Sequence, residues 1–128
     1  LRRGAAFVAT RSDGAVLLRK RPQKGLLGGM SEVPTTGWSA RTDGETGAGA
    51  APFAADWRHA GRIGHVFTHF SLELEVYHAA AGGTAPEGHF WSGPAGVWGE
   101  ALPTVMKKAI ELALPAATKR RPPAKGGR

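Results

Sequence analysis

The stretch Phe70-Ser71-Leu72-Glu73-Leu74-Glu75-Val76-Tyr77 alternates apolar and polar side chains from one residue to the next. A period of two places the two kinds of side chain on opposite faces of an extended chain, so the stretch predicts a half-buried β-strand. The preceding run, 58–66, is predicted to pair with it, and the residues between the two strands, 67–69, form a corner. Such a hairpin is rigid and holds the side chains of its corner in place.

Outward from this hairpin, the chain predicts short strands and a single helix. Strands are expected at 4–11 and 15–20, an extended segment at 31–34 and a short strand at 89–91, with Ser12-Asp13-Gly14 as a turn. The Gly- and Ala-rich run 37–52 predicts a mobile loop, and 53–57 a single helical turn. The sum is an α+β fold, a mixed β-sheet with few helices.

The predicted helix covers 103–114. Pro103 suits the first helical position, where its missing N–H would be unpaired in any case. An apolar stripe faces the core and is made of Leu102, Val105, Met106, Ala109 and Ala113. Pro115 ends the helix, so residues 1–115 are predicted to form one domain, and the Pro-, Lys- and Arg-rich residues 116–128 a basic disordered tail.

Charge and composition narrow the possible partners. The 128 residues carry a formal net charge of +7, with positive side chains crowded before residue 25 and after residue 118. Clustered positive charge favours a polyanion, most commonly nucleic acid. Cysteine is absent, which excludes disulfides and an iron–sulfur cluster within this chain, and no apolar run approaches the roughly 18 residues of a membrane span. The chain begins at Leu1 rather than Met, so we expect it to be a fragment or a processed product.

Three motifs follow one another along the chain: Arg21-Pro-x-Lys24-Gly-Leu-Leu-Gly-Gly-Met30-x-Glu32-Val-Pro34, His65-Val-Phe-Thr-His-Phe70, and Leu102-Pro-Thr-Val-Met-Lys107-Lys-Ala109. In this order they resemble the C-terminal domain of MutY-type adenine DNA glycosylases. The resemblance implies a Nudix-like fold and a role in base-excision repair, in which the parent enzyme removes adenine mispaired with 8-oxoguanine. It also implies a missing N-terminal catalytic domain with an iron–sulfur cluster, and a monomeric protein of the bacterial cytoplasm, associated with the nucleoid.

The same resemblance assigns residues to the recognition of DNA. In the family a Phe-Ser-His loop contacts 8-oxoguanine, which implies that Phe67, Thr68 and His69 contact the lesion. Thr68 replaces the serine but keeps the hydroxyl, with an extra methyl and a stiffer side chain. Phe67 is expected to wedge or pack near the lesion, Thr68 to hydrogen-bond its modified edge, and His69 to contact phosphate. Arg19, Arg21 and Lys24 are expected along the DNA backbone.

Other readings stay open on the residues alone. A Nudix-type hydrolase of oxidised nucleotides would need clustered carboxylates to hold magnesium, and the stretch after Gly28-Gly29 offers only Glu32, Asp43 and Glu45. We expect Glu32 to serve the fold, by bonding loop amides, and the chain itself to be inactive. A protein-interaction module is the second alternative. The glycine pair is expected in a structural loop, the four tryptophans in or at the core, and the five histidines without zinc.

Overall fold

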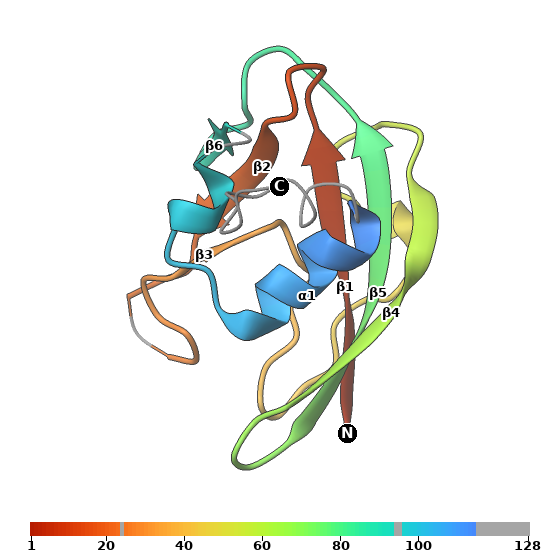
Figure 1. Ribbon diagram of the computed structural model, residues 1–128. Coiled ribbons are helices and arrows are strands. Elements are labelled where there is room, and N and C mark those ends of the chain that lie inside the picture. The colour runs from red at the N-terminus through yellow and green to blue at the C-terminus, as the bar shows by residue number, and fades with distance from the viewer. Residues whose placement is uncertain (24, 94–95, 115–128) are drawn as a thin grey trace, which may run out of the picture.

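The computed structural model describes residues 1–23, 25–93 and 96–114. Figure 1 shows a twisted sheet with one α-helix across its face. In chain order the elements are β1 (Arg2–Thr10), β2 (Val16–Lys20), β3 (Ser31–Glu32), the 3₁₀ turn η1 (Ala48–Ala50), β4 (Arg58–Val66), β5 (Ser71–Ala80), β6 (His89–Ser92), the 3₁₀ turn η2 (Val97–Gly99) and α1 (Thr104–Ala113). The predicted α+β class and mixed sheet are confirmed, and Lys24 and the tail 116–128 lie outside the described residues.

The sheet has the order β3-β2-β1-β5-β4, with β6 also paired to β2. β1 runs parallel to β5, and the remaining pairs are antiparallel. Residues 4–9 of β1 are buried without alternation, as expected of a strand covered on both faces. β4 and β5 form the predicted hairpin, and Leu72, Leu74 and Val76 of β5 are at most 1% exposed.

Helix α1 packs on β1, β4 and β5 and closes the main core. Its buried side chains are Val105, Met106, Ala109 and Ile110. Ile110 was absent from the predicted stripe, whereas Ala113 is only half-buried. Pro103 caps the helix and does not occupy its first turn, because its ψ of 156° is extended. Burial of Val105, Met106 and Ile110 contributes about 1.5–3 kcal/mol for each side chain, so α1 is a main support of the sheet.

The segment 37–57 differs from its prediction. Residues 53–57 form no helical turn; the Trp57 indole donates to the Phe53 carbonyl at 2.9 Å and packs edge-on against Phe7 at 5.3 Å. Before it, the loop is tied to β1, since the Gly44 amide donates to the Arg3 carbonyl at 2.8 Å. The first half of β1 has no strand on this edge, and loop atoms satisfy its backbone groups instead. The loop predicted to be mobile is therefore anchored.

No helix in the described part of the chain is long and apolar enough to cross a membrane.

Candidate nucleic-acid interface

The corner between β4 and β5 is a tight turn that presents two polar side chains. The Phe67 amide donates to the Phe70 carbonyl at 2.8 Å, directly after the last strand pair, Val66 with Ser71. Thr68 and His69 between them are exposed, at the tip of the long hairpin that projects beyond the rest of the sheet in Figure 1. The tip therefore offers a hydroxyl and an imidazole to a partner without rearrangement.

Phe67 is held by aromatic neighbours on the side of the corner that faces the core. Its ring stacks on Phe70 at 4.8 Å with an angle of 18°, meets His65 edge-on at 4.7 Å, and lies 6.4 Å from Trp38. These four residues, His65, Phe67, Phe70 and Trp38, are called the aromatic cluster below. Phe67 itself is half-buried, so it can present a ring edge beside Thr68, whereas full insertion into DNA would require it to leave Phe70.

Trp38 is the most deeply buried member of the aromatic cluster. It is 3% exposed and lies against the backbone of β1, where a Cβ at Gly4 would come within 2.6 Å of Trp38 Cδ1. The guanidinium of Arg21 lies over the indole ring, 5.0 Å from its centroid, in cation–π geometry. Trp38 confirms the prediction of a core tryptophan, and Trp57 and Trp91 are half-buried; the Trp98 side chain lies outside the description.

Glu32 binds both arginines that are expected along the DNA backbone, Arg19 and Arg21. Its carboxylate is 2.8 Å from Arg19 Nε and 2.6 Å from Arg21 Nη1, and the residue is only 2% exposed. Arg21 also donates to the Leu26 carbonyl at 3.0 Å, and Arg19 to the Thr35 carbonyl at 3.1 Å. Glu32 serves the fold as predicted, but its partners are guanidinium groups and not loop amides. The contact of either arginine with DNA stays a prediction.

The loop around Gly28 and Gly29 uses its amides internally. Gly28 donates to the Gly25 carbonyl at 3.1 Å, and Gly29 to the Pro22 carbonyl at 3.0 Å. A Cβ at Gly28 would lie 2.1 Å from the Gln23 carbonyl oxygen, so the loop closes on itself too tightly for a side chain there. Because these amides already have acceptors, the structural interpretation of the loop is favoured over a phosphate cradle.

The face of the β4–β5 hairpin that points away from α1 carries a charged pocket that the sequence did not indicate. It has a volume of about 490 Å³ and is lined by Arg3, Thr46, Gly47, Arg62, Glu73, Glu75 and Tyr77. Glu75 accepts from His59 and Arg62, each at 2.7 Å; burial raises the pKa of Glu75, but these bonds outweigh it and the pKa lies below its usual value. Charges of both signs neutralise one another here, which disfavours a polyanion.

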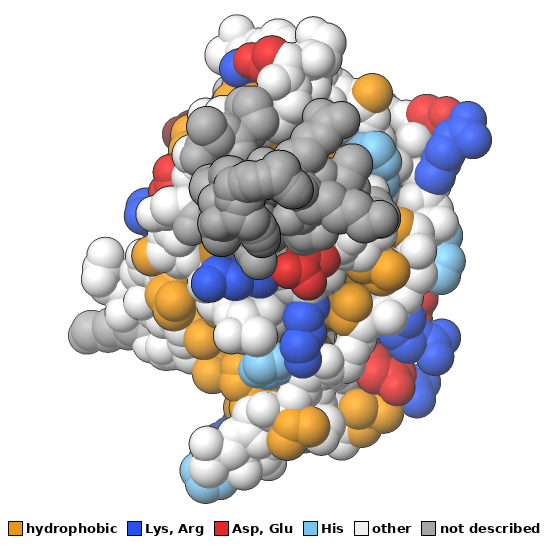
Figure 2. Space-filling model, viewed as in Figure 1, with side chains coloured by type: hydrophobic (Ala, Val, Ile, Leu, Met, Phe, Trp, Pro, Cys, Tyr) orange, Lys and Arg blue, Asp and Glu red, His pale blue; other side chains and the backbone are white. Residues whose placement is uncertain are grey.

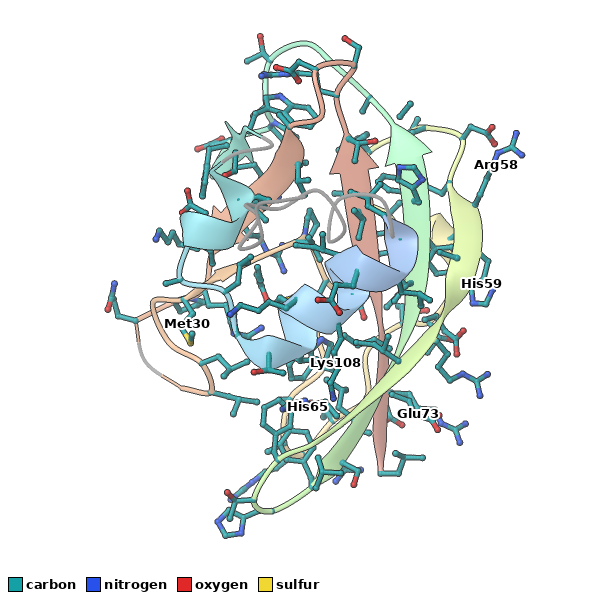
Figure 3. The ribbon with its side chains drawn as sticks, in the orientation of Figure 1. Met30, Arg58, His59, His65, Glu73 and Lys108 are labelled. Carbon is teal, nitrogen blue, oxygen red and sulfur yellow. The ribbon has the colours of Figure 1, made fainter. Side chains whose placement is uncertain are left out.

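Figure 2 shows the α1 face of the molecule, where hydrophobic side chains gather beside a histidine and a lysine above the hairpin tip. Figure 3 identifies this pair as His65 and Lys108, with side chains that lie close together between α1 and β4. No pattern in the sequence indicates that they lie close together, because 42 residues separate them along the chain. Among residues 1–23, 25–93 and 96–114, no three His, Asp or Glu side chains converge as a metal site would require.

Comparison with known proteins defines the class. A family model described as the NUDIX domain matches residues 5–112. Human adenine DNA glycosylase is 32% identical over 111 residues, which are 76% of this chain and 20% of that protein. The chain thus spans about a fifth of the length of this relative.

Solved structures agree with the fold. The C-terminal domain of mouse MUTYH, in a complex with human PCNA, has a TM-score of 0.68 at 24% identity and covers 94% of this chain and 90% of its own. A MutT protein from Methanosarcina mazei Go1 has a TM-score of 0.62 at 13% identity, covering 85% and 89%. The chain belongs to the Nudix domain family. Within this family, the chain is similar in sequence to human adenine DNA glycosylase and in fold to the C-terminal domain of mouse MUTYH.

Proposed function

We propose that this chain is the lesion-recognition domain of an adenine DNA glycosylase, which binds duplex DNA at 8-oxoguanine opposite adenine. The observation that carries the proposal is the corner, where the exposed Thr68 and His69 stand next to a Phe67 ring that is fixed by three aromatic neighbours. A hydroxyl both accepts and donates, as the oxidised base requires: 8-oxoguanine differs from guanine by a hydrogen at position 7 and an oxygen at position 8. His69 contacts phosphate, which every nucleotide carries. The identity to human adenine DNA glycosylase supports the enzyme class of the parent protein.

We expect Thr68→Ala to lower the discrimination between 8-oxoguanine and guanine by about 1–2 kcal/mol, on the scale of one lost base-edge contact. Thr68→Ser should retain the preference because it keeps the hydroxyl. His69→Ala should weaken binding to both duplexes about equally. The measurement is fluorescence anisotropy of the chain on matched duplexes at low salt, where phosphate contacts keep the affinity measurable. An unchanged lesion-to-guanine ratio in Thr68→Ala would mean that the corner is only a turn.

The second candidate is a Nudix hydrolase of oxidised nucleotides, favoured by the fold shared with the MutT protein. Hydrolysis requires converging carboxylate oxygens to hold magnesium against a pyrophosphate. In the described part of the chain the most deeply buried carboxylate, Glu32, binds two arginines, and Asp13 and Asp56 each pair with one. This arrangement supports a recognition domain over a hydrolase.

We therefore expect no turnover of 8-oxo-dGTP by the chain in the presence of magnesium, because Glu32 is bound by two arginines and no three acidic or histidine side chains converge in the described part of the chain. Chromatographic analysis of the nucleotides after prolonged incubation is the measurement. Asp43→Asn and Glu45→Gln serve as controls, since both acids lie in the segment where a catalytic box would stand. Turnover that disappears in Glu32→Gln or in either control would favour the hydrolase.

A further inference from the structure

A lysine of α1 reaches across to the strand that leads into the corner. Lys108 Nζ lies 3.0 Å from the Gly64 carbonyl and 3.2 Å from His65 Nδ1 (Figure 3). Both acceptors belong to β4, within three residues of Phe67. The ammonium group therefore fastens the helix to the base of the recognition corner and makes a specific bond to an imidazole.

This bond determines the protonation state of His65. An ammonium group can only donate, so His65 Nδ1 must accept, and the ring carries its proton on Nε2 as a neutral imidazole. The surroundings favour the same state, since burial and the charge of Lys108 both lower the pKa of His65. The residue opposite His65 on β5 is Leu72, which is apolar and offers no counter-charge.

The imidazole in turn touches the ring that flanks Thr68. His65 meets Phe67 edge-on, with centroids 4.7 Å apart and planes at 69°, while Phe67 stacks on Phe70 from another side. Edge-on aromatic contacts have a preferred geometry and stabilise it beyond the effect of the area that they bury. The orientation of Phe67 therefore depends on where the His65 ring is held.

We propose that Lys108 and His65 are positioning residues for lesion recognition: Lys108 fixes the His65 ring, which fixes Phe67 and so the place of the Thr68 hydroxyl. This inference rests on the proposed function. It separates Lys108 from its neighbour on α1, Lys107, whose side chain is exposed and has no hydrogen-bond partner among the described residues. Lys107 is free to attract phosphate, whereas Lys108 acts through His65.

The two lysines provide a matched test on the full chain. Lys108→Met, which keeps the aliphatic stem, should lower the 8-oxoguanine-to-guanine affinity ratio about three- to tenfold, the range of one aromatic contact. Lys107→Met removes the same charge and should weaken both duplexes equally, with the ratio unchanged. Lys108→Arg keeps a donor and should restore most of the ratio. Equal losses in the two methionine variants would overturn the inference.

A second readout does not depend on DNA. The ¹⁵N chemical shifts of His65 should report a neutral ring protonated on Nε2 in the wild-type chain at pH 7, and a mixture of tautomers in Lys108→Met. A shift pattern that is the same in both proteins would overturn the inference. Lack of any lesion preference in the wild-type chain would overturn the proposed function, and a wild-type preference that Lys108→Met leaves unchanged would overturn this inference alone.

Discussion

Replacing Glu32 by glutamine is expected to lower the free energy of unfolding by about 3 kcal/mol, the lower end of the cost of breaking a buried ion pair from one side. The carboxylate is 2% exposed and serves two guanidinium groups, of which Arg21 retains only 15% of its side-chain exposure. Glutamine keeps the volume but turns an amide towards a cation, so Arg21 is left with an uncompensated charge. Arg19, whose side chain is 32% exposed, can regain water, which places the effect at the lower end. Urea unfolding followed by tryptophan fluorescence measures the change.

Glu75→Gln is the matched control, because Glu75 also accepts bonds from two side chains, those of Arg62 and His59. Those partners are 60% and 52% exposed, so the loss should stay below about 1 kcal/mol, as is usual for surface pairs. Equal losses in the two variants would contradict the assignment of Glu32 to a buried network. If magnesium stabilised the wild-type chain but not Glu32→Gln, Glu32 would be a metal ligand.

The local pattern of the chain was sufficient to predict the hairpin and the helix. The period of two at 70–77 and the apolar stripe of 103–114 each report burial of one face, and both elements form with bounds shifted by one to three residues. The turn at Ser12-Asp13-Gly14 was predicted from its residue types alone. At these places local preference and the final fold agree.

Contacts between distant segments could not be predicted in the same way. Periodicity does not reveal that β1 pairs in parallel with β5, or that the loop after Gly37 takes the open edge of β1. That loop is hydrogen-bonded to the edge of β1, whereas its own composition indicated a mobile segment. Similarly, the position of Trp57 is set by its contact with the Phe7 ring and not by the helical preference of residues 53–57.

The candidate site shows the same division. The exposed corner at Thr68 and His69 follows from the hairpin, and so could be found in the sequence. The supports beneath it, Trp38 and Lys108, come from segments 29 and 39 residues away from Phe67 and His69 along the chain. Likewise, Arg19 and Arg21 count as free positive charges in the sequence, whereas in the folded chain both form ion pairs with Glu32. A count of charges can predict that a chain binds a polyanion, but it cannot predict which residues contact the polyanion.

The largest expected effect on stability concerns Trp38, the most deeply buried member of the aromatic cluster. Trp38→Ala should lower the free energy of unfolding by about 3–5 kcal/mol, the cost of removing a buried large aromatic side chain. Trp38 is 3% exposed, and its indole ring lies 5.0 Å from the Arg21 guanidinium and 6.4 Å from the Phe67 ring. A cavity there would also let Phe67 sink, so the remaining folded protein should lose part of its preference for 8-oxoguanine. Denaturant unfolding and anisotropy on matched duplexes measure the two effects.

Two variants separate this role from the loss of any tryptophan. Trp38→Phe should cost less than about 1.5 kcal/mol, since it keeps an aromatic ring and the indole N–H has no hydrogen-bond partner to lose among the described residues. Trp91→Ala removes a half-buried indole that donates to the Gly83 carbonyl and lies under Arg11. It should cost about 1–2 kcal/mol and leave lesion preference unchanged, because β6 pairs with β2 and not with the hairpin. If Trp91→Ala reduced the preference as much as Trp38→Ala, the loss would reflect general destabilisation, and Trp38 would have no particular role beneath the corner.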